Sequence, residues 1–226
     1  MRIRRKKHLA ERLEKVKDYL KVPDRDIVNV KKAIEDKKYF DYESVFGNSN
    51  PVELEIGSGK GGFICQKALL NPNVNYIAVE LLENIIVMAA ENAMNLGLKN
   101  VKFLNSGAEY LPRYIKDDSI DNIYLNFSPP YPQKSYENRR LTCSRHVLAY
   151  KAFLKVGGAV YQKTDDKGLF DYSMLKFKEH GFDVKDVSAE IENGYLLNVC
   201  TEYESKFRAQ GLPIYALIAT KEKSTS

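Results

Sequence analysis

The chain has 226 residues, 44% of them hydrophobic, and it carries a formal net charge of +5. This length and composition are enough to bury a full core, so we expect one α/β domain with extensions. We find no apolar run long enough to cross a membrane and no signal peptide, and we therefore expect a cytoplasmic protein without a membrane partner. The three cysteines and three histidines are scattered without metal-ligand spacing, which argues against a disulfide framework and against a metal site.

Residues 1–50 are predicted to form a basic arm outside the core. Basic residues crowd positions 1–7, and apolar residues then recur at helical spacing until Pro23 interrupts the pattern. The apolar residues of this pattern are Leu9, Leu13, Val16 and Leu20. The spacing predicts a short amphipathic helix that docks either on the domain or on a partner. A second basic group, placed like the arm either to meet phosphates or to face solvent, comprises Lys134, Arg139, Arg140 and Arg145.

Residues 52–63 combine the pattern of a short buried strand with a glycine-rich turn and the start of a helix. The glycines that satisfy the spacing of a dinucleotide-binding turn are Gly57, Gly59 and Gly62. Glu80 ends the next predicted strand, where its carboxylate is placed to bind ribose hydroxyls. Glu55 stands shortly before the first glycine, and there it would repel a pyrophosphate but attract the sulfonium and ammonium groups of S-adenosylmethionine. We therefore favour a methyltransferase nucleotide site over a nicotinamide site.

Predicted strands and helices alternate from Pro51 onward. Strands are expected at 52–56, 75–80, 101–105, 120–127, 159–163, 182–189 and 212–220. Helices are expected at 63–70, 83–96, 108–114, 139–154 and 169–180. The alternation predicts a mostly parallel, doubly wound sheet with helices on both faces and ligands at the carboxyl ends of its strands. The last two strands have no clear helix between them, which predicts an antiparallel hairpin at the sheet edge.

Three later segments are expected to contact a substrate. Residues 126–134 must leave the sheet as a stiff loop beside the cofactor, because prolines cannot join a central strand. Asp165 follows the fifth strand, where it is placed either to accept hydrogen bonds from a base edge or to cap the next helix. Residues 201–207 mix hydroxyls, carboxylates and aromatic rings, a composition that suits either a loop over a bound base or an ordinary surface loop.

An ordered series of five motifs resembles the bacterial tRNA (guanine-N7)-methyltransferase family. The motifs occupy residues 55–61, 124–127, 139–142, 163–165 with 169–170, and 201–204 with 206–207. The resemblance implies a Rossmann-like class I methyltransferase fold, S-adenosylmethionine as donor, and N7 of a variable-loop guanine in tRNA as acceptor, in a monomer or homodimer. It implies cofactor contacts by Glu55, Gly57, Gly59, Glu80, Gly107 and Asn126. It implies substrate contacts by Gln133, Asp165, Thr201, Glu202, Tyr203 and Glu204.

The loop after the fourth strand departs from the pattern of this family. The family usually shows Asp-Pro-Trp-Pro-Lys-Lys, where this chain has Pro-Pro-Tyr-Pro-Gln-Lys, so Pro129 replaces the acid and the catalytic residue is not assigned. Gly107 also stands where the family commonly has an aspartate at the adenine end of the cofactor. N7 of guanine carries an in-plane lone pair and no hydrogen, so its methylation requires in-line placement more than a general base. We therefore expect weakened or redirected activity rather than loss of activity.

Two alternatives follow from the same departures. The segment from Ser128 to Tyr131, Ser-Pro-Pro-Tyr, resembles the signature of amino methyltransferases that act on adenine N6 or cytosine N4. A paralogue that binds tRNA without catalysis would keep the basic phosphate contacts after its substrate loop had decayed. Methylation of an exocyclic amine would identify the first alternative, and cofactor binding without methyl transfer would identify the second.

Overall fold

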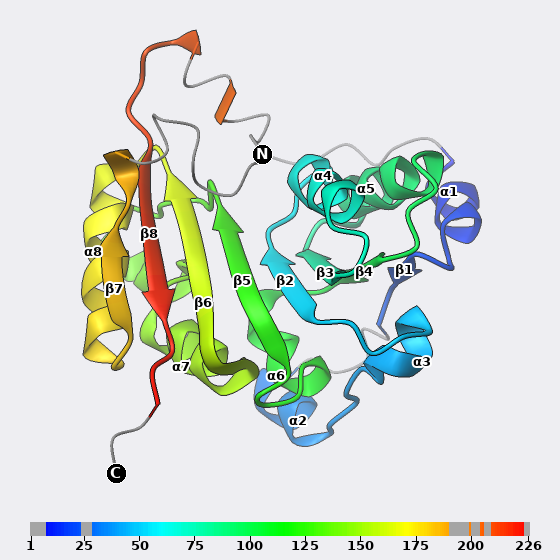
Figure 1. The fold of residues 1–226 in the computed structure, drawn as a ribbon, viewed down its shortest axis with the longest axis horizontal. Coiled ribbons are helices and arrows are strands. Elements are labelled where there is room, and N and C mark those ends of the chain that lie inside the picture. The colour runs from blue at the N-terminus through cyan, green and yellow to red at the C-terminus, as the bar shows by residue number, and fades with distance from the viewer. Residues whose placement is uncertain (1–7, 24–28, 190–198, 200–203, 206–208, 224–226) are drawn as a thin grey trace.

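The structure is a computed structural model of the chain, and it describes residues 8–23, 29–189, 199, 204–205 and 209–223. The described residues form an eight-stranded sheet with the order β1-β4-β3-β2-β5-β6-β8-β7 (Figure 1). Its strands are β1 (Leu20–Lys21), β2 (Val52–Ile56), β3 (Asn75–Glu80), β4 (Val101–Asn105), β5 (Ile120–Asn126), β6 (Leu154–Thr164), β7 (Asp183–Asp186) and β8 (Tyr215–Thr220).

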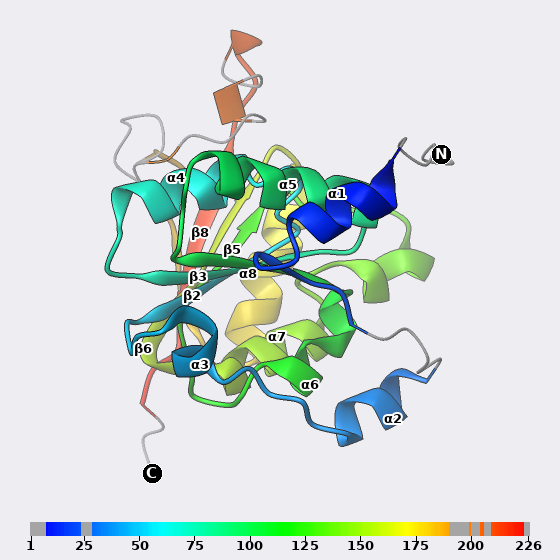
Figure 2. The same cartoon turned by 90° about the vertical axis from the view of Figure 1, so that its right-hand side faces the viewer.

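Helices lie on both faces of this sheet (Figure 2). The α-helices are α1 (Leu9–Lys15), α2 (Val30–Glu35), α3 (Tyr42–Phe46), α4 (Gly62–Leu70), α5 (Glu83–Asn95), α6 (Leu111–Tyr114), α7 (Ser144–Phe153) and α8 (Lys167–Glu179). Two short 3-10 helices are η1 (Ala108–Tyr110) and η2 (Lys134–Arg139). Helices α1, α4 and α5 bury their apolar residues against one face, and α6, α7 and α8 bury theirs against the other. Two apolar layers therefore enclose the sheet, as the alternation predicts.

The strand pairing confirms the predicted topology. Strands β1 to β6 pair in parallel, whereas β8 pairs antiparallel with both β6 and β7. All residues of the central strand β2 are buried. Its apolar residues Val52, Leu54 and Ile56 join the apolar layer of α6, α7 and α8, whereas Glu53 and Glu55, which alternate with them, accept hydrogen bonds from side chains of β5. The two largest displacements of predicted bounds lie at β6 and α7. Strand β6 begins at Leu154 rather than at residue 159, and helix α7 begins at Ser144 because the segment before it forms η2 and a turn.

The described part of the predicted arm packs against the sheet and its helices. Leu9, Val16 and Leu20 are at most 7% exposed, and they join the apolar layer of α4 and α5. The Arg12 guanidinium donates to both carboxylate oxygens of Glu91 on α5, at 2.6 and 2.5 Å. Strand β1 then adds to the sheet edge beside β4. The amphipathic helix therefore docks on this chain, while the division of function between residues 1–50 and the rest stays a prediction.

Candidate functional site

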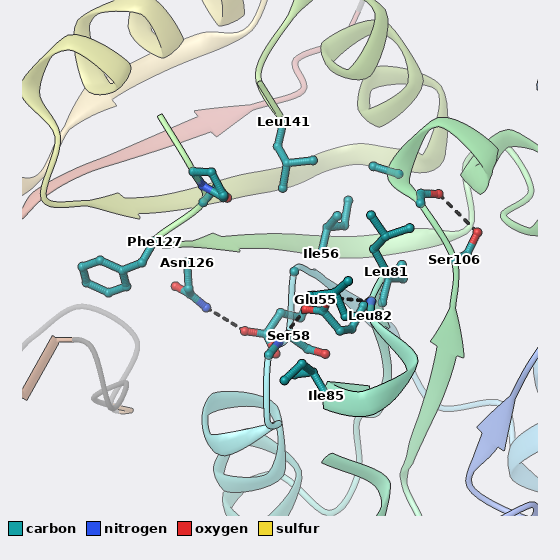
Figure 3. A pocket seen from close by; sticks show the side chains of 18 of the residues that line it. Glu55, Ile56, Ser58, Leu81, Leu82, Ile85, Ser106, Asn126, Phe127 and Leu141 are labelled. Carbon is teal, nitrogen blue, oxygen red and sulfur yellow. Dashed lines mark hydrogen bonds between the residues drawn. The ribbon is translucent and has the colours of Figure 1, made fainter. Parts of the chain in front are cut away.

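A cavity of about 940 Å³ opens at the carboxyl ends of β2, β3, β4 and β5 (Figure 3). This is the edge of the sheet where the alternation of strands and helices predicts a ligand. The glycine turn after β2, the segment after Glu80, the loop after β5 and the beginning of α7 all contribute to its walls. Its volume suits a ligand the size of a nucleoside with an amino acid attached.

The turn between β2 and α4 brings its backbone close to the cavity. Gly57 and Gly59 line the cavity with φ angles of 83° and 55°, which side chains of L-residues rarely allow. The amide of Gly57 donates to the Val79 carbonyl at 2.8 Å, which fixes the turn on the neighbouring strand. Gly61 also requires glycine, because a Cβ there would lie 2.8 Å from the Cβ of Ala89 on α5. The spacing rule selected Gly62 rather than Gly61, since it carries no information about this contact between helices.

Glu55 lies at the centre of the cavity. Glu55 is 2% exposed, and its Oε1 accepts a hydrogen bond from Nδ2 of Asn126 at 3.0 Å (Figure 3). Among the residues that the structure describes, Oε2 has no hydrogen-bond partner. Burial raises the pKa of the Glu55 carboxyl to about 7; the bond from Asn126 lowers it, and the charge of Glu80 adds to the rise. A buried acceptor with an unused oxygen is suited to a ligand that brings a positive charge and N–H donors.

Glu80 occupies the next strand end and is held by two backbone amides. Its Oε2 accepts from the Gly59 amide at 3.1 Å, and its Oε1 accepts from the Leu82 amide at 2.9 Å. Each carboxylate oxygen can accept more than one hydrogen bond, so both remain able to accept from the hydroxyls of a ribose. The same two bonds make Glu80 part of the turn, which means that its replacement would also disturb the position of Gly59.

The loop after β5 is held in a strained shape by an arginine. Phe127 and Tyr131 have φ angles of 50° and 43°, a region that costs non-glycine residues about 1–2 kcal/mol each. Arg140 donates through Nε to the Pro130 carbonyl at 3.1 Å and through Nη2 to the Tyr131 carbonyl at 3.0 Å. Its guanidinium also lies 4.3 Å from the ring centroid of Tyr172. Arg140, expected to meet phosphates or to face solvent, instead fixes this loop.

The beginning of α7 supplies a wall of the cavity that the sequence patterns did not indicate. His146 is buried, and burial lowers its pKa to about 4, with the charge of Arg145 contributing. The imidazole is therefore neutral at pH 7. Its Nε2 lies 3.4 Å from Nη2 of Arg145, and because a guanidinium only donates, Nε2 is the acceptor. Arg145, His146 and Leu141 line the cavity opposite the glycine turn. Leu141 belongs to the motif at residues 139–142. Arg145 was marked only as a member of a basic group and His146 by no pattern, so the sequence did not indicate these two as cavity residues.

The residues expected to contact a substrate have different environments. Gln133 is exposed and lies outside the cavity lining. Asp165 is also exposed, at the end of β6, and the cap of α8 is supplied by Asp166, whose Oδ1 accepts from the Leu169 amide at 2.6 Å. The alternative interpretation of Asp165 as the helix cap is therefore wrong.

The Glu204 carboxylate pairs with a buried lysine of β6. Its Oε2 lies 2.7 Å from Nζ of Lys163, and the two residues are 2% and 1% exposed. This carboxylate faces the protein interior rather than an open surface. Thr201, Glu202 and Tyr203, the other members of the same motif, lie outside the described residues.

The described part of the chain has neither a cluster of metal ligands nor a membrane-spanning helix. Within it, no group of three or more histidine, cysteine or acidic side chains is arranged to hold a metal ion. None of the helices in it is long and apolar enough to span a membrane.

Comparisons with known proteins were made for the sequence and for the structure. Residues 49–217 match a family described as a putative methyltransferase. The chain is 45% identical over 179 residues to the tRNA (guanine-N(7)-)-methyltransferase of Bacillus licheniformis, an alignment that covers 79% of this chain and 84% of that protein. It is 37% identical over 220 residues to the enzyme of the same name from Streptococcus uberis, covering 97% and 99% of the two chains.

Solved structures with the same fold are also methyltransferases. The crystal structure of the 16S rRNA methyltransferase KamB superimposes with a TM-score of 0.60 at 15% identity, covering 83% of this chain and 96% of that one. The structure of an antibiotic-related methyltransferase superimposes with a TM-score of 0.54 at 17% identity, covering 90% and 97%. Identities this low support the Rossmann-like methyltransferase fold alone.

Proposed function

The chain belongs to the tRNA (guanine-N7)-methyltransferase family, and we propose that it methylates N7 of a variable-loop guanine in tRNA with S-adenosylmethionine as donor. The observation that carries the proposal is the Glu55 carboxylate, buried beside the glycine turn with one oxygen unused by the described residues. A tRNA substrate implies that the reaction takes place in the cytoplasm.

The cavity residues fit this cofactor in charge and in hydrogen-bonding character. Glu55 would hold the ammonium group, Glu80 would hold the ribose hydroxyls, and the positive-φ backbone at Gly57 and Gly59 admits close approach to the main chain. When bound, S-adenosylmethionine supplies an electrophilic methyl group on a sulfonium. Asn126 donates a hydrogen bond to one oxygen of Glu55 at 3.0 Å and so holds the carboxylate in place. The other oxygen is therefore fixed in its direction.

We assign to the loop after β5 the positioning of the guanine base rather than a proton transfer. The guanine N7 lone pair needs no base to free it, so a rigid loop that aligns the base in line with the methyl group is sufficient. Arg140 keeps that loop in its strained shape. Because His146 is neutral at pH 7, it does not repel the positive charge that develops on the guanine ring during methyl transfer. Pro129, in place of the aspartate usual in the family, therefore lowers the rate of methyl transfer but leaves N7-methylguanosine as the product.

The substrate side is assigned to Asp165 and, indirectly, to Glu204. Asp165 is exposed at the end of β6 and is not used as the helix cap, so its carboxylate is available to accept hydrogen bonds from an exposed base edge. We assign Glu204 to positioning rather than to substrate contact, because Lys163 holds its carboxylate in the interior at 2.7 Å. The pair would attach Glu204 to the end of β6.

Nucleoside analysis tests the proposed reaction. The purified protein is incubated with S-adenosylmethionine and tRNA transcribed without modifications, and the digested RNA is examined by mass spectrometry. We expect N7-methylguanosine, and we expect Asp165→Ala to reduce it without changing cofactor affinity. Methylation of an exocyclic amine would contradict the proposal in favour of the Ser-Pro-Pro-Tyr alternative. Binding of tRNA without any methylated product would contradict it in favour of a paralogue that only binds.

A further inference from the structure

We propose that Glu109 recognises the adenine amino group of the cofactor in this chain, from a position that the small size of Gly107 makes available. The inference rests on the proposed function, because it assumes a cofactor with an adenine base. It concerns a residue that neither the glycine-turn pattern nor the matching motifs identify.

The backbone at residue 107 does not itself require glycine. Gly107 precedes η1 with φ −79° and ψ 152°, an extended conformation open to any L-residue. The space beside it is occupied instead: a Cβ at this position would lie 2.5 Å from Oε2 and 2.8 Å from Oε1 of Glu109, so the Glu109 carboxylate would have to move. The carboxylate of Glu109 therefore occupies the volume in which a side chain at residue 107 would begin. An acidic group is present at this end of the cavity although residue 107 supplies none.

The strand order places Glu109 where an adenine base would lie. Glu55 is on β2, Glu80 ends the adjacent β3, and Glu109 follows β4, the next strand outward. Adjacent strands are about 4.8 Å apart, so successive strand ends can follow successive parts of one extended ligand. An ammonium at Glu55 and a ribose at Glu80 place the base near the end of β4.

The walls at this end suit a flat aromatic ring with one polar edge. Leu81, Leu82 and Ile85 line the same cavity, and Leu81 and Leu82 are 63% and 42% exposed, so their side chains are accessible to a ligand (Figure 3). Glu109 also lines the cavity, and among the described residues it has no hydrogen-bond or ion-pair partner. The apolar residues can cover the faces of a base while the carboxylate remains available to its edge.

The chemistry of a carboxylate distinguishes adenine from a six-oxo purine. Adenine presents a two-hydrogen amino donor at position 6, whereas hypoxanthine and guanine present a carbonyl acceptor there. A carboxylate only accepts, so it bonds the amino group and repels the carbonyl oxygen. Glu109 should therefore select the adenine nucleoside, and its charge should make that hydrogen bond stronger than one from a neutral acceptor.

Calorimetric binding of two ligands to the full chain tests this assignment without requiring activity. S-adenosylhomocysteine carries the amino group, and S-inosylhomocysteine carries an oxygen in its place. We expect the wild type to prefer the adenine ligand at least about tenfold. Glu109→Ala should bind the adenine ligand about tenfold more weakly and lose most of this preference. Asp117→Ala, which removes an exposed carboxylate outside the cavity lining, is the matched control and should bind as the wild type does.

A compensating substitution separates recognition from misfolding. In the double variant Gly107→Asp/Glu109→Ala, the new aspartate starts from the volume that Glu109 vacates, so it should restore much of the preference for adenine. Gly107→Asp alone should bind less tightly than the wild type, because its Cβ and charge would meet the carboxylate of Glu109.

Two results would overturn the inference in different ways. An unchanged preference in Glu109→Ala would remove Glu109 from adenine recognition while leaving the proposed function in place. Failure of the wild type to bind S-adenosylhomocysteine at all would overturn the proposed function, and the inference with it.

Discussion

Replacing Glu55 by glutamine removes the ionisable group at the centre of the cavity while keeping its size and shape. The carboxyl has an ordinary pKa of 4.5, and burial raises it to about 7 in the folded protein. A shift of this size corresponds to about 3 kcal/mol of differential interaction between the two protonation states. The charged carboxylate is therefore costly in the free protein, and that cost should be measurable as a dependence of stability on pH.

The direction of that dependence follows from proton binding. Below about pH 4.5 the Glu55 carboxyl is protonated in the folded and in the unfolded protein. Between about pH 4.5 and pH 7, it has lost its proton in the unfolded chain but keeps it in the folded protein. The contribution of this group to stability is thus fully present at low pH and is lost as pH rises through 7. We expect the unfolding free energy of the wild type, minus that of Glu55→Gln, to fall by about 2–3 kcal/mol between pH 5 and pH 8.5. Urea denaturation measures both values, and a difference independent of pH would refute the raised pKa.

Cofactor binding should show the opposite dependence on pH. A bound ammonium favours the ionised carboxylate, so the wild type must release a proton from Glu55 to bind. With a pKa of about 7, the ionised fraction rises about eightfold from pH 6 to pH 7.5, and the affinity for S-adenosylmethionine should rise by the same factor. Glu55→Gln should bind more weakly and lack this rise, and it also corrects for titration of the ligand's own amine. The same pH dependence in both proteins, measured by calorimetry, would contradict the contact.

Three further predictions concern the loop after β5 and the end of β6. Arg140→Met should slow tRNA methylation in single-turnover assays, because the carbonyls of the loop after β5 lose their donor. The affinity for S-adenosylhomocysteine should stay unchanged. An unchanged rate would show that Arg140 does not position the loop. Lys163→Met should lower the unfolding free energy, measured by urea denaturation, by about 3–5 kcal/mol, because the buried Glu204 charge loses its cation. The double variant Lys163→Met/Glu204→Leu should recover part of that loss. A cost near zero for Lys163→Met would contradict the buried pair. Asp165→Ala should reduce RNA methylation at unchanged stability, whereas Asp166→Ala should lose about 1 kcal/mol of stability with its helix cap; the reverse pattern would contradict both assignments.

The position of Glu55, Gly57 and Glu80 around one cavity could be predicted because these residues follow local patterns. Glu55, Gly57 and Glu80 stand at fixed offsets from buried strands, and parallel strands bring their carboxyl ends to one edge. The same regularity predicted the core strands, since short apolar runs between turns are typical of a buried parallel sheet. Bounds were less predictable where strand residues are not buried, as near the beginning of β6, where Lys155 and Val156 are both exposed.

The remaining cavity residues depend on contacts that no local pattern encodes. Glu109 lines the cavity from η1 and His146 lines it from α7, and neither residue belongs to a motif. The pairing of Lys163 with Glu204 joins two segments that are far apart in the sequence. The family resemblance implied a substrate contact for Glu204, but burial against Lys163 gives its carboxylate a structural partner.

Single-turnover methylation of unmodified tRNA by the wild type and by Pro129→Asp tests the central claim, that this cavity methylates guanine N7 by positioning and without a loop carboxylate. Both the rate and the methylated nucleoside are measured at saturating S-adenosylmethionine. We expect N7-methylguanosine from both proteins, with a faster rate for Pro129→Asp because an acid there can offset the developing charge. N7-methylguanosine from Pro129→Asp alone would contradict the claim, because it would show that the carboxylate is required.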